Sequence, residues 1–377
     1  MGITINGKNA SAVVYSDTIE DYAFTQIKNI CDNEAAKGST IRVMPDVHPG
    51  FVAPIGLSMT VGNRILPNLV GIDIGCGMTV AKIKKHRGME FKQLDSVINN
   101  RIPSGFQTRK IPHRFSSQFD FDSIACRRHL QKDAVELGLG TLGSGNHFIE
   151  IDRDDDKEFY IVVHSGSRRL GKEITDFYLD TGRKELRKRN IEVPYELTYI
   201  EGSLMEDYLH DIRLAQEFAV LNRLAMIDEI AKGMGWKTET PYSCVHNYID
   251  FSNEESPAPI LRKGATSAKK GESVVIPINM RDGVILGTGK GNREWNYSAP
   301  HGSGRVMKRE DVRKNFTVSS FKAQMKGIYC SCISQGTLDE APFAYRTLED
   351  IRKAVEETVT VEKIIKPVYN FKAGGEE

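Results

Sequence analysis

Four of the nine histidines lie in short segments rich in glycine, serine or asparagine: His147, His164, His246 and His301. His164 directly follows the apolar run 159–163, so we expect it at the end of a buried strand, facing a loop. A single histidine of this kind is most often a structural residue. Four in similar contexts favour a site in which imidazoles bind a ligand or take part in catalysis.

Asp73 and Cys76 lie three residues apart in the glycine-rich run 71–77. In a tight turn, a carboxylate and a thiolate at this spacing can face one point. Together with imidazole they suit a borderline transition ion, such as manganese, cobalt or zinc, better than magnesium. The spacing alone leaves a second interpretation open, in which Cys76 is a small buried hydrophobic residue.

A second glycine-rich run, residues 287–292, has the backbone freedom of an anion-binding nest. It lacks the spacing of a P-loop and the helix that should follow one. Taken alone, the run is therefore only a weak indication of nucleotide phosphates.

Composition excludes several classes of protein. The net charge is +1, from 51 basic and 50 acidic residues, so RNA binding would depend on local basic patches. The six cysteines are too sparse for a disulfide framework, and no signal peptide or membrane-spanning run is evident. These features predict a reduced, cytoplasmic protein with no membrane attachment.

The predicted elements form one α+β domain, residues 1–377, with a mixed β-sheet core. Apolar runs predict strands at 11–15, 78–83, 158–163 and 273–278. Ser203 and Glu206 have capping-box spacing and predict a helix from 203 to about 232, and Thr347 opens a further helix. Residues 171–236 are rich in helical patterns and are interpreted as a helical insertion.

Eight short segments and one lysine together resemble the RtcB family of RNA ligases. They occur in family order and span nearly the whole chain: Met44–His48, Gly71–Met78, Gly143–Glu150, His164–Arg168, His246–Tyr248, Arg262–Ala265, Gly289–Asn292, His301–Arg305 and Lys372. The resemblance implies the α+β fold of that family. It also implies an RNA ligase that uses GTP and two manganese ions per subunit.

The resemblance also implies roles for particular residues. Asp73, Cys76 and His147 would hold one manganese ion, and Cys76, His164 and His246 the other, with Cys76 bridging. His301 would attack the α-phosphorus of GTP and become guanylylated. A 2′,3′-cyclic phosphate end would be opened to a 3′-phosphate, which takes the guanylate, and a 5′-hydroxyl end would then displace GMP.

The implied nucleotide-binding residues come from several segments: Asn146, Phe148, Glu150, Asn247, Pro277, Ile278, Asn279, Met280, Val284, Gly302, Ser303, Gly304 and Lys372. The chain departs from the family pattern here. The family usually has glycine and serine at positions 278 and 279, and a serine at position 284. These differences bear on nucleotide affinity or base choice. With the short chain and the Ala299-Pro300-His301 context, they suggest a divergent branch acting in RNA repair rather than in tRNA splicing.

Partners follow from the same resemblance. The substrate would be RNA with broken ends, such as tRNA or rRNA, and an archease-like protein could activate the enzyme. Candidate RNA-binding residues are Arg42, Arg168, Arg169 and the cluster Arg127, Arg128 and His129. Two alternatives stay open: a metal-dependent phosphodiesterase or phosphatase that acts on RNA ends without sealing them, and a non-catalytic RNA-binding protein.

Overall fold

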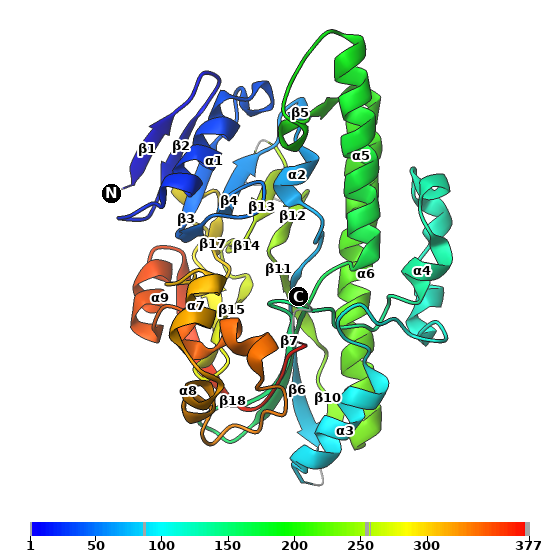
Figure 1. The fold of residues 1–377 in the computed structure, drawn as a ribbon, viewed down its shortest axis with the longest axis vertical. Coiled ribbons are helices and arrows are strands. Elements are labelled where there is room, and N and C mark those ends of the chain that lie inside the picture. Colours follow the sequence, from blue (N-terminus) through cyan, green and yellow to red (C-terminus); the bar gives the residue numbers. More distant parts are fainter. Residues whose placement is uncertain (1, 86–87, 253–255, 257, 374–377) are drawn as a thin grey trace.

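The computed structural model describes residues 2–85, 88–252, 256 and 258–373. It contains two large sheets flanked by helices, which confirms the α+β class (Figure 1). The six-stranded sheet has the order β1 (Ile3–Asn6), β2 (Ser11–Val14), β3 (Ile41–His48), β4 (Ile55–Thr60), β13 (Ile260–Lys263), β12 (Asn247–Asp250). Its β2–β3 pair is parallel and its other pairs are antiparallel, so the sheet is mixed.

The eight-stranded sheet carries most of the candidate site. Its order is β10 (Lys237–Thr238), β6 (Gly77–Lys85), β8 (Phe159–Ser165), β7 (Phe148–Arg153), β18 (Val359–Phe371), β16 (Gly283–Gly289), β15 (Ser273–Asn279), and β11 (Tyr242–Val245) also pairs with β6. Two short pairs complete the strands: β5 (Arg64–Ile65) with β9 (Ile200–Glu201), and β14 (Ala265–Ser267) with β17 (Ser298–Pro300).

Strand β8 shows why this sheet forms. Its apolar run is buried on both faces, as expected for a central strand. Ile161 and Val163 pack in one cluster with Ile227 and Ile230 of helix α6 (Gly202–Met234). Val162 belongs to a separate cluster on the other face, together with side chains of β15 and β16. Because successive side chains of a strand point to opposite faces, β8 packs against helix α6 on one face and against side chains of β15 and β16 on the other.

Two long helices, α5 (Arg169–Lys188) and α6, lie side by side along one side of the molecule (Figure 1). They account for most of the helix-rich segment expected at 171–236. The remaining helices are short: α1 (Asp21–Asp32), α2 (Pro67–Val70), α3 (Phe91–Arg101), α4 (Lys132–Glu136), α7 (Arg309–Asn315), α8 (Val318–Gln324) and α9 (Leu348–Val355). No helix in the described ranges is both long and apolar enough to cross a membrane.

The four predicted strands are confirmed as β2, β6, β8 and β15, with ends that differ by at most two residues. Thr347 caps α9 through a capping box with Asp350, as predicted for a helix start. The capping box predicted at Ser203 is wrong. Helix α6 begins one residue earlier, with Glu201 at the N-cap and no capping side chain, because Gly202 turns the chain with a φ of 59°.

Candidate active site

The ends of four neighbouring strands carry the histidines and the cysteine predicted to bind metal. Cys76 immediately precedes β6, His147 precedes β7, His164 lies near the end of β8, and His246 follows β11. The antiparallel register pairs residue 77 with residues 165 and 245, and residue 148 with His164. Pairing therefore brings these four side chains to the same edge of the sheet.

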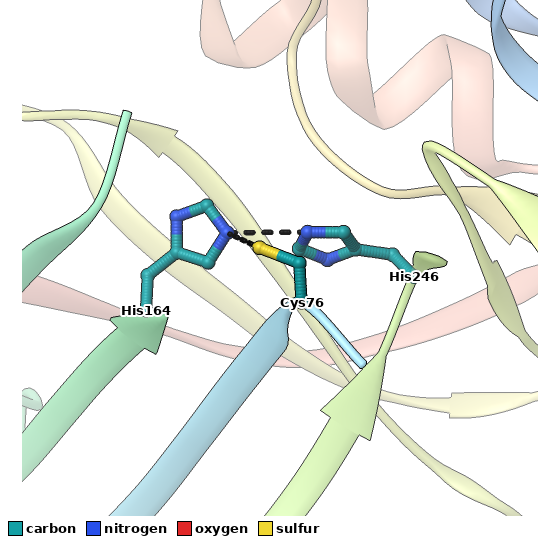
Figure 2. A group of neighbouring side chains, drawn as sticks. All are labelled: Cys76, His164 and His246. Atoms are coloured by element: carbon teal, nitrogen blue, oxygen red, sulfur yellow. Dashed lines mark hydrogen bonds between the residues drawn. The ribbon is translucent and has the colours of Figure 1, made fainter. Parts of the chain in front are cut away.

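The side chains meet closely (Figure 2). The Sγ atom of Cys76 lies 3.2 Å from Nε2 of His164 and 3.4 Å from Nε2 of His147. Nε2 of His164 lies 3.1 Å from Nε2 of His246, and Nε2 of His147 lies 3.1 Å from Oδ2 of Asp73. Two triads result, Asp73–Cys76–His147 and Cys76–His164–His246, each with its ligand atoms within 4.8 Å of one another. They share Cys76.

Backbone carbonyl groups fix the orientation of two of the rings. Nδ1 of His147 lies 2.9 Å from the carbonyl oxygen of Leu142, and Nδ1 of His164 lies 3.1 Å from that of Asn146. Because a carbonyl only accepts hydrogen bonds, each Nδ1 carries the proton and each Nε2 presents a lone pair to Cys76. This is the usual orientation of a metal-binding histidine, so the residues fit a bound ion.

The charges of the cluster support the same interpretation. Burial lowers the pKa of His164 and of His246 well below the usual value, which keeps both rings neutral. Burial and the neighbouring Asp73 raise the pKa of the Cys76 thiol well above its usual value. Burial opposes ionisation of Asp73, but His147 outweighs it and holds the pKa of that carboxyl below its usual range. A bound cation would supply the charge that turns this thiol into a thiolate ligand.

The turns around the cluster have no space for larger residues. A Cβ atom on Gly166 would lie 2.0 Å from Oδ1 of Asp73, so the backbone of β8 can approach this carboxylate only at a glycine. The buried Arg223 of α6 donates hydrogen bonds to the carbonyl oxygens of Gly75 and Ser165. The helix thereby holds together the two turns that carry Cys76 and His164.

His301 follows β17 and lies beside the cluster, with its ring centroid 4.9 Å from that of His246. Its Nδ1 lies 2.8 Å from Oδ2 of Asp46, which is 2% exposed. The carboxylate accepts a hydrogen bond from the N–H at Nδ1. Nε2 is then the ring nitrogen with an available lone pair. Sequence reasoning gave Asp46 no role. An acidic residue inside the buried strand β3 was the available signal.

A pocket of about 750 Å³, counted to its open mouth, adjoins His301 and His164. Most of the predicted nucleotide-binding residues line it: Asn146, Phe148, Glu150, Pro277, Ile278, Asn279, Met280, Gly302, Ser303, Gly304 and Lys372. Sequence reasoning did not assign six others to the pocket: His48, Gly283, Arg305, Arg309, Glu340 and Tyr345.

Glu340 lies at the centre of a network of charged and polar side chains on the pocket wall. Its carboxylate accepts hydrogen bonds from Nζ of Lys372 at 2.8 Å, from the hydroxyl of Tyr345 at 2.6 Å and from Arg309 at 2.5 Å. Burial opposes its ionisation, but Lys372 and the arginines outweigh burial and hold the pKa of Glu340 below its usual range. Nζ of Lys372 also donates to the carbonyl oxygen of Asn146, at 3.2 Å.

The comparisons with known proteins show the family of the chain. The chain matches the family described as tRNA-splicing ligase RtcB over residues 26–127 and 118–373. An Escherichia coli K12 protein named RNA-splicing ligase RtcB is 30% identical over 370 residues, which cover 88% of this chain and 90% of that protein. The chain belongs to the RtcB family. An Aeropyrum pernix protein named tRNA-splicing ligase RtcB is 26% identical over 435 residues, which cover 90% of this chain and 90% of that protein.

Two of the predicted nucleotide-binding residues lie off the pocket that the described residues of this RtcB-family chain form. Val284 is fully buried in β16, paired with Pro277 and packed in the core of the sheet. Asn247 lies beside the metal-ligand cluster, where its Oδ1 accepts a hydrogen bond from the backbone N–H of Gly264 at 2.9 Å. Its position favours a structural role.

The residues that depart from the RtcB pattern mostly interact within the protein. Asn279 lines the pocket, but its side chain is hydrogen-bonded to Asp282 and to the backbone N–H of Arg281. Ile278 is 2% exposed and packs in a buried cluster, and its carbonyl oxygen accepts a hydrogen bond from Ser303. The glycine-rich run 287–292 forms the end of β16 and the turn after it, so the structure does not support its weak phosphate-binding indication.

The predicted RNA-binding arginines are scattered. The guanidinium of Arg168 packs against Gly143 and donates to the carbonyl oxygen of Gly105 at 3.4 Å, near Asp73. Arg169 forms an ion pair with Glu173. Arg42 donates to the carbonyl oxygen of Glu294, and the 127–129 cluster forms a short 3-10 helix. The structure thus brings only Arg168 close to the cluster that carries Asp73.

Proposed function

We propose that this chain is an RNA ligase that uses GTP and two manganese ions to join RNA ends. One observation carries the proposal: His301, with its Nδ1 held by Asp46, lies between two triads of candidate metal ligands and a pocket lined by most of the predicted nucleotide-binding residues. The set of donor atoms, one thiol with imidazoles and a carboxylate, favours a borderline ion such as manganese.

The first step would be guanylylation of His301. Nε2 attacks the α-phosphorus of GTP, a nitrogen–phosphorus bond forms, and the bond to pyrophosphate breaks. Asp46 fixes the ring with Nε2 as the nucleophile and stabilises the positive charge that develops on the imidazole. Bound metal ions would withdraw charge from the phosphate.

The pocket would orient the guanylate. Phe148 offers an aromatic face, Lys372 a cation 5.5 Å from that ring, and Glu150 a carboxyl group. Burial raises the pKa of Glu150 to about 8, so this group can present a hydrogen-bond donor near neutral pH. In the second and third steps an RNA 3′-phosphate takes the guanylate from His301, and a 5′-hydroxyl end then displaces GMP.

The decisive experiment is adduct formation with GTP labelled at the α-phosphate in the presence of Mn²⁺. We expect an acid-labile GMP adduct on the wild-type protein and none on His301→Ala, because only this histidine carries the nucleophile. His210→Ala removes an exposed histidine of α6 and is the matched control that keeps the adduct. An unlabelled wild-type protein would overturn the ligase proposal.

A second assay separates ligation from hydrolysis. RNA with a 2′,3′-cyclic phosphate end is incubated with Mn²⁺, with and without GTP. We expect joined RNA only with GTP. Product that forms equally well without GTP would instead indicate a metal-dependent phosphodiesterase or phosphatase. A substrate set of nicked tRNA and rRNA, tested with and without an archease, addresses the proposed role in RNA repair.

A further inference from the structure

Two of the six cysteines differ from the rest in exposure and spacing. Cys31, Cys76, Cys126 and Cys244 are buried, whereas Cys330 and Cys332 are partly exposed. This pair is separated by one residue, and its two Sγ atoms lie 3.1 Å apart. No third histidine, cysteine or carboxylate in the described ranges completes a metal-binding group with the pair, which favours thiol chemistry over metal binding.

The segment that carries the pair is fixed against the end of β18. Tyr329 forms a parallel bridge with Tyr369, and the backbone N–H of Asn370 donates to the carbonyl oxygen of Tyr329 at 2.9 Å. The hydroxyl groups of Ser331 and Tyr369 both donate to Oδ1 of Asp95 in α3, at 2.5 and 2.8 Å. The residues on either side of Cys330 are therefore fixed to β18 and α3, and this segment holds the two thiols next to each other.

Cys332 also contacts the nucleotide pocket through Lys372. Its Sγ accepts a hydrogen bond from the backbone N–H of Lys372 at 3.2 Å. The side chain of the same lysine reaches Glu340 and the carbonyl oxygen of Asn146 on the pocket wall. Any displacement of this sulfur thus acts directly on the backbone of a pocket residue.

The surroundings make the two sulfurs chemically unequal. The two Sγ atoms lie within hydrogen-bond distance, with either thiol able to donate, and the backbone N–H of Lys372 donates to Sγ of Cys332. These contacts outweigh burial and lower the pKa of Cys332. The same contact between the two sulfurs, together with burial, raises the pKa of Cys330. Cys332 is therefore the more readily ionised thiol of the pair, and a thiolate is the reactive form of cysteine.

We propose that Cys330 and Cys332 form a reversible oxidation site, in which an intramolecular disulfide loosens the Lys372 side of the pocket. A peroxide serves as the oxidant. The Cys332 thiolate attacks one peroxide oxygen, the O–O bond breaks, and a sulfenic acid forms while the leaving hydroxide takes a proton from solvent to become water. Cys330 attacks that sulfur, an S–S bond forms, and a second water leaves. The two thiols lose two electrons, and the peroxide gains them.

The disulfide changes the contact with Lys372. An S–S bond is about 2.05 Å long, so the two sulfurs must approach each other by about 1 Å from their present separation. A disulfide sulfur is also a weaker acceptor than a thiolate, and the N–H of Lys372 loses its charged partner. The expected result is weaker nucleotide binding, by about tenfold. This last consequence alone rests on the proposed function.

The test uses the full chain in three forms: wild type, Cys330→Ser and Cys126→Ser. Cys330→Ser keeps the Cys332 acceptor but cannot form the disulfide, and Cys126→Ser removes a buried cysteine elsewhere as the matched control. Each protein is treated with hydrogen peroxide and then with dithiothreitol. Peptide mapping by mass spectrometry locates the bond, and hydrogen exchange reports on the N–H of Lys372. Binding of a fluorescent GTP analogue without metal reports on the pocket.

We expect a 330–332 disulfide in wild type and Cys126→Ser, faster exchange at Lys372 and weaker nucleotide binding, all reversed by dithiothreitol. Cys330→Ser should form no disulfide; oxidation of its Cys332 stops before the sulfur is drawn toward residue 330, so exchange at Lys372 and nucleotide binding should change less than in wild type. A peroxide-treated wild type without this disulfide overturns the proposal, as does an equal response in Cys330→Ser. If the disulfide forms and exchange at Lys372 rises but the reduced protein binds no GTP analogue, the oxidation site stands and the proposed function fails.

Discussion

The two halves of the candidate active site are built in different ways. In the metal-ligand half, four side chains lie at the ends of paired strands, so the register of β11, β6, β8 and β7 brings them to one edge, and Asp73 joins them from the turn before β6. The nucleotide half is assembled from turns, short helices and residues around 277–283, 301–309, 340–345 and 372. Its far wall has a small core of its own, formed by Met280, Val312, Phe321, Met325, Leu338, Ala341 and Ala344.

This difference predicts how each half responds to substitution. A sheet register tolerates no partial shift, because a slip by one residue turns every side chain to the other face. The metal-ligand half should therefore respond to substitution in an all-or-none way. A wall of turns and short helices is held by individual contacts, and its function should decline by steps.

The largest effect is expected from Cys76→Ala, because both triads lose their shared ligand. Bound manganese, measured by elemental analysis of the purified protein, should fall to background. Adduct formation with GTP should fall by at least about 10³-fold. Cys126→Ala, at another buried cysteine, should retain both. Full metal content in Cys76→Ala would show that the halves do not differ as described.

Asp46→Asn should come next. An amide cannot stabilise a developing imidazolium, and it can bind the wrong tautomer of His301. We expect the rate of adduct formation to fall roughly 10²- to 10³-fold, while metal content stays at the wild-type level. Rapid-quench measurement at saturating GTP checks the rate. Loss of metal together with the rate would place Asp46 in the metal-ligand half instead.

A buried ion pair in the six-stranded sheet, which carries the chain on from His246, gives a pH-dependent test of the stability of the fold. Asp250 of β12 lies 2.9 Å from the fully buried Arg262 of β13, and the pKa of Asp250 is lowered to about 2 because Arg262 and Lys269 outweigh burial. A folded pKa below the unfolded value near 3.8 adds stability that is present above that value and is lost as the pH falls through about 2.

The expected contribution of Asp250 is about 2 kcal/mol at pH 6, of which roughly half is lost by pH 3. Urea unfolding of wild type and Asp250→Asn over this range measures it. The variant should be less stable at pH 6, since it leaves Arg262 without its carboxylate, and the difference should narrow in acid. A difference that stays constant with pH would show that ionisation of Asp250 is not its source.

The smallest effect is expected in the nucleotide half, from Glu340→Gln. The amide keeps the shape but removes the charge that holds Lys372 and Arg309. We expect the Kd for GTP to rise about tenfold, with no change in metal content. Isothermal titration checks this, with Glu310→Gln on exposed α7 as the control. A loss as complete as that of Cys76→Ala would contradict the stepwise behaviour of this half.

The sequence predicted which five side chains lie together in the metal-ligand half, for a physical reason. Each ligand lies at a junction between an apolar strand and a glycine-rich turn, and both signals are local. The strands β6 and β8 were predicted from the same runs that position Cys76 and His164. The motifs of the family, found in the same order along this chain, indicated that these junctions belong to one site. The structure brings the five side chains together.

The nucleotide half was predicted less completely, because its contacts depend on distant segments. Glu340 lies in a short 3-10 helix with no recognisable motif, and only its meeting with Lys372 gives it a place in the pocket. Val284 was expected in the pocket by analogy, but in strand pairing its position faces the core. The Ser203 capping box failed for a related reason, since Gly202 let the helix start earlier.

Strand β18 has a consequence for the order in which the protein is made. It is the last strand of the described chain, yet it lies between β7 and β16 in the middle of the eight-stranded sheet. Synthesis proceeds at about 5–20 residues per second, so the ribosome exposes every candidate metal ligand and His301 several seconds before this strand. Until β18 pairs with β7 and β16, these two strands have no strand between them to join them, and Lys372 has not reached Glu340. A growing chain thus carries His301 without a finished pocket, and the proposed nucleotide chemistry could start only after β18 has been inserted.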